Sequence, residues 1–390
     1  MEIKELVHQI HSSGYEFVLA ITGGGTEAIG ELLRYGGGSA TLLEAVVPYS
    51  QQALDAFTGR KPEKYASSRT ARAMAMAAFQ RAMLLQRPGK NGGSNILGIS
   101  ATCTLARSGE RKERQHELYM AVQSLQNTTT YSICFLEKRD REHEETLVSL
   151  SIINMVASAC DLDVGITYGT ELSSQERPQI RRAQATKAIS DMLLHKDNDS
   201  NVIKRCVRVN GKEGSAQHSH KIIFSGSFDP CHRNHVEMAR IAARKYGVPV
   251  HFEISLINVD KPPIDYISLE DRISSIQACY DPDFMGDIFV TNTPLFAEKA
   301  NIFPDSTFII GADTMKRLFN NRYYRPQDDL HSLLDHFREK CVDFLVFSRK
   351  GTEIEIPPEV EPIITIISED EYRDDGISST QIRKVQQNKS

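Results

Sequence analysis

Short apolar runs alternate with helical patterns throughout the second half of the chain, and this alternation constrains the fold more than any other sequence feature. Strands that alternate with helices form βαβ units, whose helices cover both faces of a parallel sheet. We therefore expect a Rossmann-like, doubly wound α/β domain over residues 221–390, with ligands at the carboxyl ends of its strands. The expected strands are 221–224, 250–254, 288–290, 307–310, 344–347 and 363–367, and the expected helices are 235–245, 269–279 and 314–319.

The first half of the chain also mixes both patterns, which predicts a separate α/β layer domain over residues 1–195. Two domains agree with a length of 390 residues. Residues 196–220 are polar and weakly patterned, so we expect a linker there. The expected strands of this half are 17–21, 41–47, 95–99, 117–123 and 129–135, and the expected helices are 67–86, 142–159 and 179–195.

Composition excludes several classes of protein. The net charge of −5 gives no strong global attraction to nucleic acid or to an anionic membrane. The seven cysteines are scattered singly, which argues against a disulfide framework or a zinc site and for a reducing compartment. No apolar run approaches the ~18 residues of a membrane span, and the first residues lack the apolar core of a signal peptide. We expect a cytoplasmic protein with neither a membrane nor a nucleic-acid partner and without a dedicated metal site.

The segment GSFDPCHRNH follows the strand at residues 221–224 and opens a helix. Gly226 removes a side chain where the backbone could approach a phosphate. His232 and His235 are three residues apart at the helix start, so they share a face. A helix N-terminus attracts anions, and imidazole groups there could donate to phosphoryl oxygens. The alternative is a turn with surface histidines.

A second polar segment, GISSTQIR, lies near the end of the chain and begins at Gly376. Ser378, Ser379 and Thr380 are residue types that cap helix N-termini. Arg383 would lie one turn inside that helix, where its guanidinium group can donate to phosphates. The alternative is a helix cap without a ligand.

Together these segments resemble the two signatures of the nucleotidylyltransferase superfamily, (H/T)xGH in its GSFDPxHxxH form and ISSTxIR. The resemblance implies that His232 and His235 contact a nucleotide triphosphate, with His235 as the main transition-state group, and that Arg383 binds the phosphates. The glycine that the family has between its histidines is Asn234 here, which bears on activity. The remaining nucleotide-binding residues implied by the resemblance are Gly226, Ser227, Phe228, Ile377, Ser378, Ser379 and Thr380.

A third segment resembles one subfamily, the nicotinamide and nicotinate mononucleotide adenylyltransferases. The segments FIIGAD and LVFSRKG are similar to the pattern FIIGAD…LVxxRxG. The resemblance implies that Gly311 and Asp313 lie against the adenosine. A tryptophan common in the family is absent, because this chain has none, and Tyr323 or Tyr324 is the candidate for stacking on the acceptor's ring.

The loop that follows the expected strand 250–254 is similar to the family's loop that meets the acceptor phosphate. Its candidates are Asn258 and Lys261, and the alternative is an ordinary proline-rich loop. Arg272 in the next helix also fits the family pattern, or a solvated helix face. The implied reaction transfers AMP from ATP to the mononucleotide, with Mg²⁺ bridging the phosphates.

The first half resembles the C-terminal domain of the competence-damage (CinA) family, whose enzymes deamidate nicotinamide mononucleotide. The matches are Thr22-Gly-Gly, the segment beginning at Pro48, the strand ending at Ser100, and Arg141. The family's active serine falls at Ala20 and its lysine at Leu54, neither of which can do that chemistry. We therefore favour a ligand-binding or structural domain over an amidase, although Thr22 or Ser100 are candidate substitutes. Arg107 and Arg111 are candidate phosphate ligands in a charged loop. The resemblance to the CinA family also implies a homo-oligomer.

Three hypotheses remain in competition. The first is an adenylyltransferase that makes a pyridine dinucleotide. The second is a nucleotidylyltransferase with another acceptor or nucleotide, such as CTP with a phospho-alcohol. The third is a non-catalytic nucleotide sensor or scaffold, motivated by Asn234, by the missing tryptophan and by the altered site of the first half.

Overall fold

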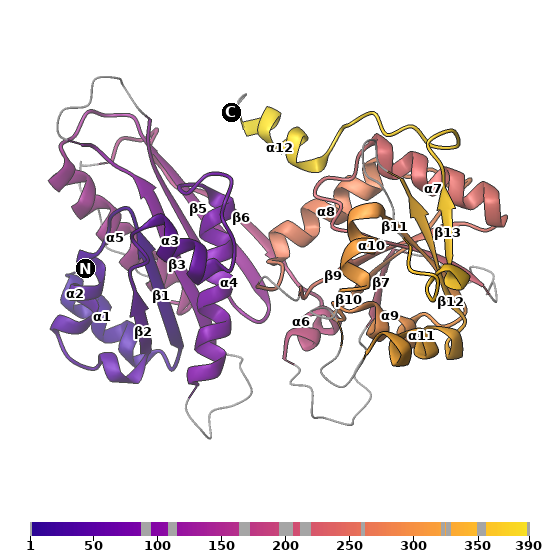
Figure 1. The fold of residues 1–390 in the computed structure, drawn as a ribbon. Helices are drawn as coiled ribbons and strands as arrows, with labels where there is room; N and C mark the ends of the chain where they lie inside the picture. The colour runs from indigo at the N-terminus through magenta and orange to yellow at the C-terminus, as the bar shows by residue number, and fades with distance from the viewer. Residues whose placement is uncertain are drawn as a thin grey trace. The chain divides into compact units, whose positions relative to one another are not determined.

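The computed structural model describes residues 2–86, 95–107, 115–163, 172–194, 206–210, 220–258, 262–320, 324, 329–348 and 356–387. The chain divides into two compact units. The first unit holds residues 1–190 and 260–267, and the second holds residues 191–259 and 268–390. Each unit contains one sheet with helices packed on it (Figure 1), which confirms an α/β protein with two domains.

The first unit is built on a six-stranded mixed sheet in the order β2-β1-β3-β4-β5-β6. Its first three strands are parallel and the remaining pairs are antiparallel. The strands are β1 (Glu16–Thr22), β2 (Leu42–Val46), β3 (Ile96–Thr104), β4 (His116–Gln123), β5 (Asn127–Phe135) and β6 (Gln179–Gln184). The helices are α1 (Ile3–Ser12), α2 (Glu27–Arg34), α3 (Gln51–Thr58), α4 (Ser68–Leu85) and α5 (Arg141–Ala159), with a 3₁₀ turn η1 (Gly38–Ala40).

Both faces of this sheet are covered, which explains why β1 and β3 are buried along their whole length. Helices α1, α2 and α5 share one apolar cluster with Met120 and Val122 of β4. Ala121 lies between those two residues and therefore points to the opposite face. There it packs with Ala71 and Ala75 of α4. The small side chains of α4 let this helix lie close to the sheet.

A short segment from the second half of the sequence belongs to the first unit. The Tyr266 hydroxyl donates to the carbonyl of Leu125 at 2.7 Å, and its backbone N–H donates to Thr128 Oγ1 at 3.0 Å. Asp265 forms a buried ion pair with Arg72 at 3.0 Å. The loop expected to carry acceptor-binding residues therefore continues into a segment that is anchored in the first unit.

The second unit contains a seven-stranded sheet in the order β13-β12-β11-β8-β9-β10-β7. Six strands are parallel, and only the edge strand β7 (Cys206–Asn210) is antiparallel. The other strands are β8 (Lys221–Ser225), β9 (Val250–Ser255), β10 (Met285–Thr291), β11 (Ser306–Gly311), β12 (Val342–Phe347) and β13 (Ile364–Ile367). The chain builds outward from β8 in one direction and then returns to β11 on the other side. The strand order thus reverses between β8 and β11, where open α/β sheets bind their ligands.

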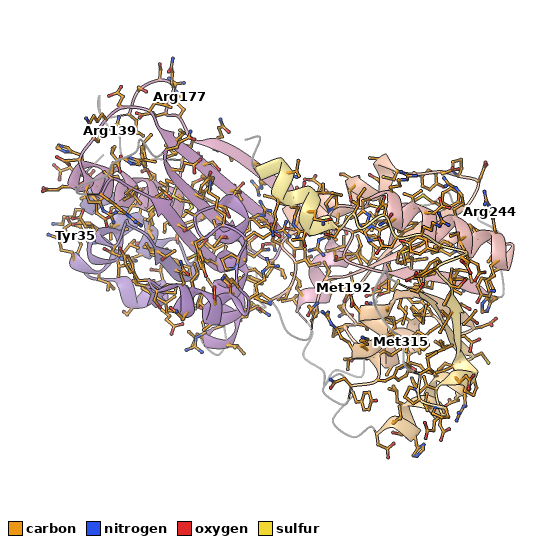
Figure 2. All side chains as sticks on the ribbon, turned by 45° about the horizontal axis from the view of Figure 1, so that its top comes forward. Tyr35, Arg139, Arg177, Met192, Arg244 and Met315 are labelled. Carbon is orange, nitrogen blue, oxygen red and sulfur yellow. The ribbon has the colours of Figure 1, made fainter. Side chains whose placement is uncertain are left out.

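Seven helices and one 3₁₀ turn accompany this sheet in the part of the chain that the structure describes. They are α6 (Lys187–Leu193), α7 (Arg233–Tyr246), α8 (Tyr266–Ala278), α9 (Phe296–Ile302), α10 (Ala312–Leu318), α11 (Leu330–Glu339), α12 (Ser379–Gln387) and η3 (Glu361–Ile363). A core of aromatic and aliphatic residues joins β11 and β12 to α9, α10 and α11. Met315 of α10, labelled in Figure 2, is part of that core. None of the helices in the described ranges is both long and apolar enough to cross a membrane.

Two local expectations differ from the structure. The helix expected at 179–195 is instead the edge strand β6 followed by α6, because a strand that exposes five of its six residues carries no alternating apolar signal. The expected linker 196–220 contains β7, which pairs with β10 through its backbone. Its residues CVRVN have a two-residue alternation too short to separate from a loop.

The close approach of α4 to β3 yields a test of the first unit. A methyl group on Gly98 would lie 2.1 Å from the Ala75 carbonyl oxygen and 2.1 Å from the Phe79 nitrogen. Because both neighbours are backbone atoms, we expect Gly98→Ala to destabilise the unit by about 1–3 kcal/mol or more. The matched control is Gly30→Ala on α2, where a methyl group meets nothing within 4 Å and should stabilise the helix by about 0.5–1 kcal/mol. Urea unfolding followed by circular dichroism measures both, and equal stability of the two variants would contradict the packing described.

Candidate functional site

The loop that leaves β8 is fixed to the core by a buried aromatic ring. Phe228 is fully buried and packs against Phe224, Phe252 and His235, with ring centroids 5.1–5.2 Å away. A methyl group on Gly226 would lie 2.8 Å from that ring. Gly226 is therefore required by the packing of Phe228, a reason that the sequence did not reveal. Only the backbone of Phe228 can face a ligand, whereas the intermediate exposure of Ser225 and Gly226 leaves the loop accessible.

The two signature histidines lie together at the start of α7. His232 is the N-cap residue, and its ring centroid is 3.8 Å from that of His235. The backbone N–H of His232 donates to His235 Nδ1 at 3.2 Å. A neutral His235 must then carry its proton on Nε2. The helix start thus presents an imidazole whose tautomer is set by the backbone.

Burial keeps His235 neutral. Burial first, and the neighbouring His232 second, lower the pKa of His235 to about 3. At neutral pH the ring is therefore a hydrogen-bond donor without a net charge. Such a donor can stabilise charge that develops on a phosphoryl oxygen, because it is already oriented.

The second motif lies against the first, although the two are about 150 residues apart in the sequence. Ser379 Oγ donates to the Pro230 carbonyl at 2.9 Å. The Arg383 guanidinium donates to the Asp229 carbonyl and lies 3.6 Å from the Asp229 carboxylate. Arg272 of α8 approaches the same carboxylate at 3.5 Å. The Asp229 carboxylate therefore holds both arginines next to the signature loop.

The start of α12 is held by its own side chains. The Ser378 N–H donates to Gln381 Oε1 at 2.9 Å, and the Gln381 N–H donates to Ser378 Oγ at 3.3 Å. These reciprocal bonds form a capping box. Thr380 Oγ1 accepts from Arg383 at 3.1 Å, and Ile377 is 40% exposed. The residues of ISSTQIR thus form an ordered helix N-terminus next to the histidines.

The third predicted segment reaches the same edge of the sheet from β11. Gly311 is the last residue of β11 and the N-cap of α10. Because β11 pairs in parallel with β8, their carboxyl ends lie side by side. A methyl group on Gly311 would meet nothing within 4 Å, and Asp313 in the next turn is exposed. Both are therefore accessible at the sheet edge where the strand order reverses between β8 and β11.

The acceptor-binding candidates are described only in part. Asn258 follows β9 at the same carboxyl edge, whereas Lys261 and Tyr323 lie outside the described residues. Tyr324 packs against the apolar core of the unit. Arg272 is not on a solvated helix face, since its side chain is only 12% exposed and pairs with Asp229.

A buried charged cluster beneath the loop was missed in the sequence. Lys299 of α9 pairs with Glu253 of β9 at 2.5 Å and donates to Ser225 Oγ at 3.0 Å. Thr291 Oγ1 donates to the other carboxylate oxygen at 2.5 Å. Both charged side chains are almost fully buried, so the pair fixes the end of β8 in one geometry. The only sequence signal was a glutamate within the apolar strand VHFEIS.

In the first unit, a protein carboxylate occupies the glycine-rich loop. The backbone N–H groups of Gly25 and Thr26 donate to Glu145 Oε1 at 2.7 and 2.9 Å. Arg141 donates to the Gly23 carbonyl at 2.7 Å and lies 3.7 Å from the Glu145 carboxylate. Glu145 thus takes the position that an external anion would take at such a loop.

The candidate substitute nucleophiles of the first unit are also bound internally. Thr22 Oγ1 donates to the Pro48 carbonyl at 3.1 Å, and the buried Ser100 donates to the Ala71 carbonyl at 2.7 Å. Ala20 is buried in β1. Arg107 is exposed, and Arg111 lies outside the described residues. The structure offers no activated nucleophile among these described residues.

Comparison with known proteins finds one family model that is similar to most of the second unit. Residues 223–385 match the family model described as Cytidylyltransferase-like. The second unit carries a cytidylyltransferase-like domain. The matched range spans β8 to α12 and includes both signature segments. No curated protein matches the chain.

Several solved structures are similar to part of the chain. The competence/damage inducible protein CihA from Agrobacterium tumefaciens is 19% identical, with 41% of this chain and 92% of that chain covered and a TM-score of 0.31. A competence or damage-inducible protein from Enterobacter asburiae is 16% identical, with 41% and 99% covered and a TM-score of 0.32. A CinA superfamily protein from Escherichia coli is 14% identical, with 40% and 88% covered and a TM-score of 0.30. These TM-scores are too low to establish a shared fold.

The lowered pKa of His235 predicts how stability depends on pH. Between pH 6.5 and about 3 the unfolded chain takes up a proton at this residue that the folded unit does not, so stability falls as the pH falls through this window. His235→Gln, which keeps an acceptor and a donor, should flatten that loss by up to about 1.4 kcal/mol per pH unit. Urea unfolding at several pH values measures the difference, with the exposed His331→Gln as the control. An unchanged pH dependence in His235→Gln would show that His235 is not held neutral.

Proposed function

We propose that the second unit is a nucleotidylyltransferase that transfers AMP from ATP to nicotinamide or nicotinate mononucleotide and releases pyrophosphate. The observation that carries the proposal is the meeting of two signature segments at one sheet edge. The loop after β8 and the start of α12 are joined by Ser379 and Arg383, which donate to the carbonyls of Pro230 and Asp229. The family match to the same residues supports nucleotidyl transfer.

The proposed chemistry is an in-line displacement. An oxygen of the mononucleotide phosphate attacks the α-phosphorus of ATP, and the bond to pyrophosphate breaks as the new bond forms. Catalysis of such a step needs positioning and charge stabilisation rather than a covalent nucleophile. His235 would donate from Nε2 to the reacting phosphate, and His232 would contact the triphosphate beside it. Arg383 and the α12 N-terminus would hold the remaining phosphate oxygens.

The other candidates have positioning roles in this proposal. Gly311 and Asp313 would lie against the adenosine, since both are accessible at the carboxyl end of β11. Asn258 and Lys261 would bind the acceptor phosphate. The buried pair of Glu253 and Lys299 would keep Ser225 and the following loop rigid during the reaction. The preference for ATP and for a pyridine mononucleotide rests on the FIIGAD and ISSTQIR resemblances.

Magnesium would enter with the nucleotide. The described residues contain no group of three histidine, cysteine, aspartate or glutamate side chains that could hold a metal ion. In this proposal Mg²⁺ would be held mainly by phosphate oxygens and water, as it is in many ATP sites. Such an ion would neutralise charge on the phosphates, and His232, His235 and Arg383 would orient them.

The first unit has a structural or regulatory role in this proposal rather than an amidase activity. Glu145 fills the glycine-rich loop, and Thr22 and Ser100 donate to backbone carbonyls. Neither hydroxyl is paired with a base in these contacts, as an activated nucleophile requires.

A pyrophosphate-release assay tests the proposed activity. We expect turnover with ATP and one of the pyridine mononucleotides, and little with CTP or phospho-alcohols. Loss of one preorganised donor typically costs about 10²–10³ in kcat, so His235→Ala should lose at least that much while the unit stays folded. The matched control is His331→Ala, which removes an exposed histidine from α11 of the same unit. Turnover with CTP alone would favour the second hypothesis, a nucleotidylyltransferase with another nucleotide or acceptor. Nucleotide binding measured by calorimetry, without turnover for any pair of nucleotide and acceptor, would favour the third hypothesis, a non-catalytic sensor.

A further inference from the structure

Asn234 stands between the signature histidines, where the family that the segment resembles has glycine. The residue lies in the first turn of α7 and is buried, with 7% of its surface exposed. It is not among the residues with positive φ, so its backbone has a conformation that any residue can adopt. The φ angle at this position therefore does not require glycine.

The side chain of Asn234 joins the first turn of α7 to the segment before α12. Its amide nitrogen donates to Asp374 Oδ1 at 2.8 Å and to the Ile377 carbonyl at 3.3 Å. Both acceptors are about 140 residues away in the sequence. An amide nitrogen has two hydrogens, so both donors of Asn234 are used on this one segment.

The segment that Asn234 contacts is a tight turn. The Gly376 N–H donates to Asp374 Oδ1 at 3.0 Å, and the Ile377 N–H donates to Asp375 Oδ1 at 2.9 Å. Gly376 has a φ of +77°, which favours glycine. The turn leads directly into the capping box of α12, so its position sets where the α12 N-terminus begins.

The charges around Asn234 agree with a stabilising contact. The backbone N–H of Ile377 is the main cause that lowers the pKa of Asp375, burial opposes it, and the charge of Arg233 adds to the lowering. An amide that donates to a carboxylate makes a charge-assisted hydrogen bond, which is stronger than a neutral one. The acidic turn is thus held on the α7 N-terminus, whose partial charge is positive.

We propose that Asn234 is a positioning residue that fixes the α12 N-terminus relative to His232 and His235. The proposal rests on the proposed function, because the α12 N-terminus is expected to bind the ATP phosphates. A glycine here would leave Asp374 and the Ile377 carbonyl without this donor. In this proposal Asn234 replaces the family's glycine and also positions the α12 N-terminus. The replacement is then not a sign of lost activity.

The kinetic test uses Asn234→Gly, which restores the family residue, and Asn234→Ala, which removes the amide without adding backbone freedom. Hydrogen bonds to charged groups are strong enough that their loss should lower kcat/KM for ATP about tenfold or more. We expect most of this loss in KM for ATP and little in KM for the acceptor. The control is Asp370→Asn, which removes an exposed carboxylate from the same acidic stretch.

A reciprocal exchange separates positioning from a general loss of packing. Asn234→Asp places two carboxylates together and should lower kcat/KM for ATP further than Asn234→Ala. Adding Asp374→Asn restores an amide opposite a carboxylate, while the new amide oxygen can still accept from Gly376. The double variant should therefore recover part of the loss, although the bond to the Ile377 carbonyl is not restored. Wild-type kcat/KM in Asn234→Ala, or no recovery in the double variant, would overturn the proposal.

Hydrogen exchange of backbone amides distinguishes this proposal from the proposed function, because it needs no activity. In the wild-type protein the Gly376 and Ile377 amides should be protected, and Asn234→Ala should make them exchange faster while Asp370→Asn does not. Faster exchange in a protein without turnover would refute the proposed function and support the role of Asn234. Equal exchange in the wild type and in Asn234→Ala would refute the role of Asn234 even if the enzyme is active.

Discussion

The arrangement of the site depends on two backbone carbonyls of the signature loop. The carbonyls of Asp229 and Pro230 accept from Arg383 and Ser379, and these bonds bring the last helix of the chain to the first loop after β8. Neither carbonyl belongs to a helix or strand, so each needs a partner from elsewhere in the fold. The α12 segment supplies both partners. A loop held by these hydrogen bonds keeps the two imidazole rings in place at the start of α7.

The charge balance around Asp229 follows from the same arrangement. Arg272 and Arg383 both lie within 3.6 Å of its carboxylate. One carboxylate between two guanidinium groups leaves these three side chains with a net positive charge. A polyphosphate has the opposite charge and geometry suited to guanidinium groups. The chain as a whole is acidic, with a net charge of −5, so the proposed binding of phosphates would depend on this local arrangement.

Most strands and both signature segments of the second unit could be predicted from the sequence, because the patterns that indicate them are local. Buried parallel strands are apolar along their length, and the two signature segments each fold within about ten residues. The strands β6 and β7 were missed because one is exposed and the other is short, so neither has a clear apolar alternation. Contacts across long stretches of sequence were also beyond prediction. Glu145 reaches the glycine-rich loop from 120 residues away, and Asn234 reaches Asp374 from 140 residues away.

Both units have a glycine-containing loop at a helix N-terminus, but the carboxylate at that loop makes different contacts in each unit. Each unit has a glycine-containing loop between a parallel strand, β1 or β8, and the helix that follows it, which is a geometry that attracts anions. In the first unit the loop amides donate to Glu145, and the anion is part of the protein. In the second unit the loop's own carboxylate, Asp229, is paired with Arg272 and Arg383. An internal carboxylate competes with an external phosphate for the same donors, and it has the advantage of being tethered. The two units therefore differ in where each places its acidic side chain, and this difference supports the proposal that the second unit binds the nucleotide.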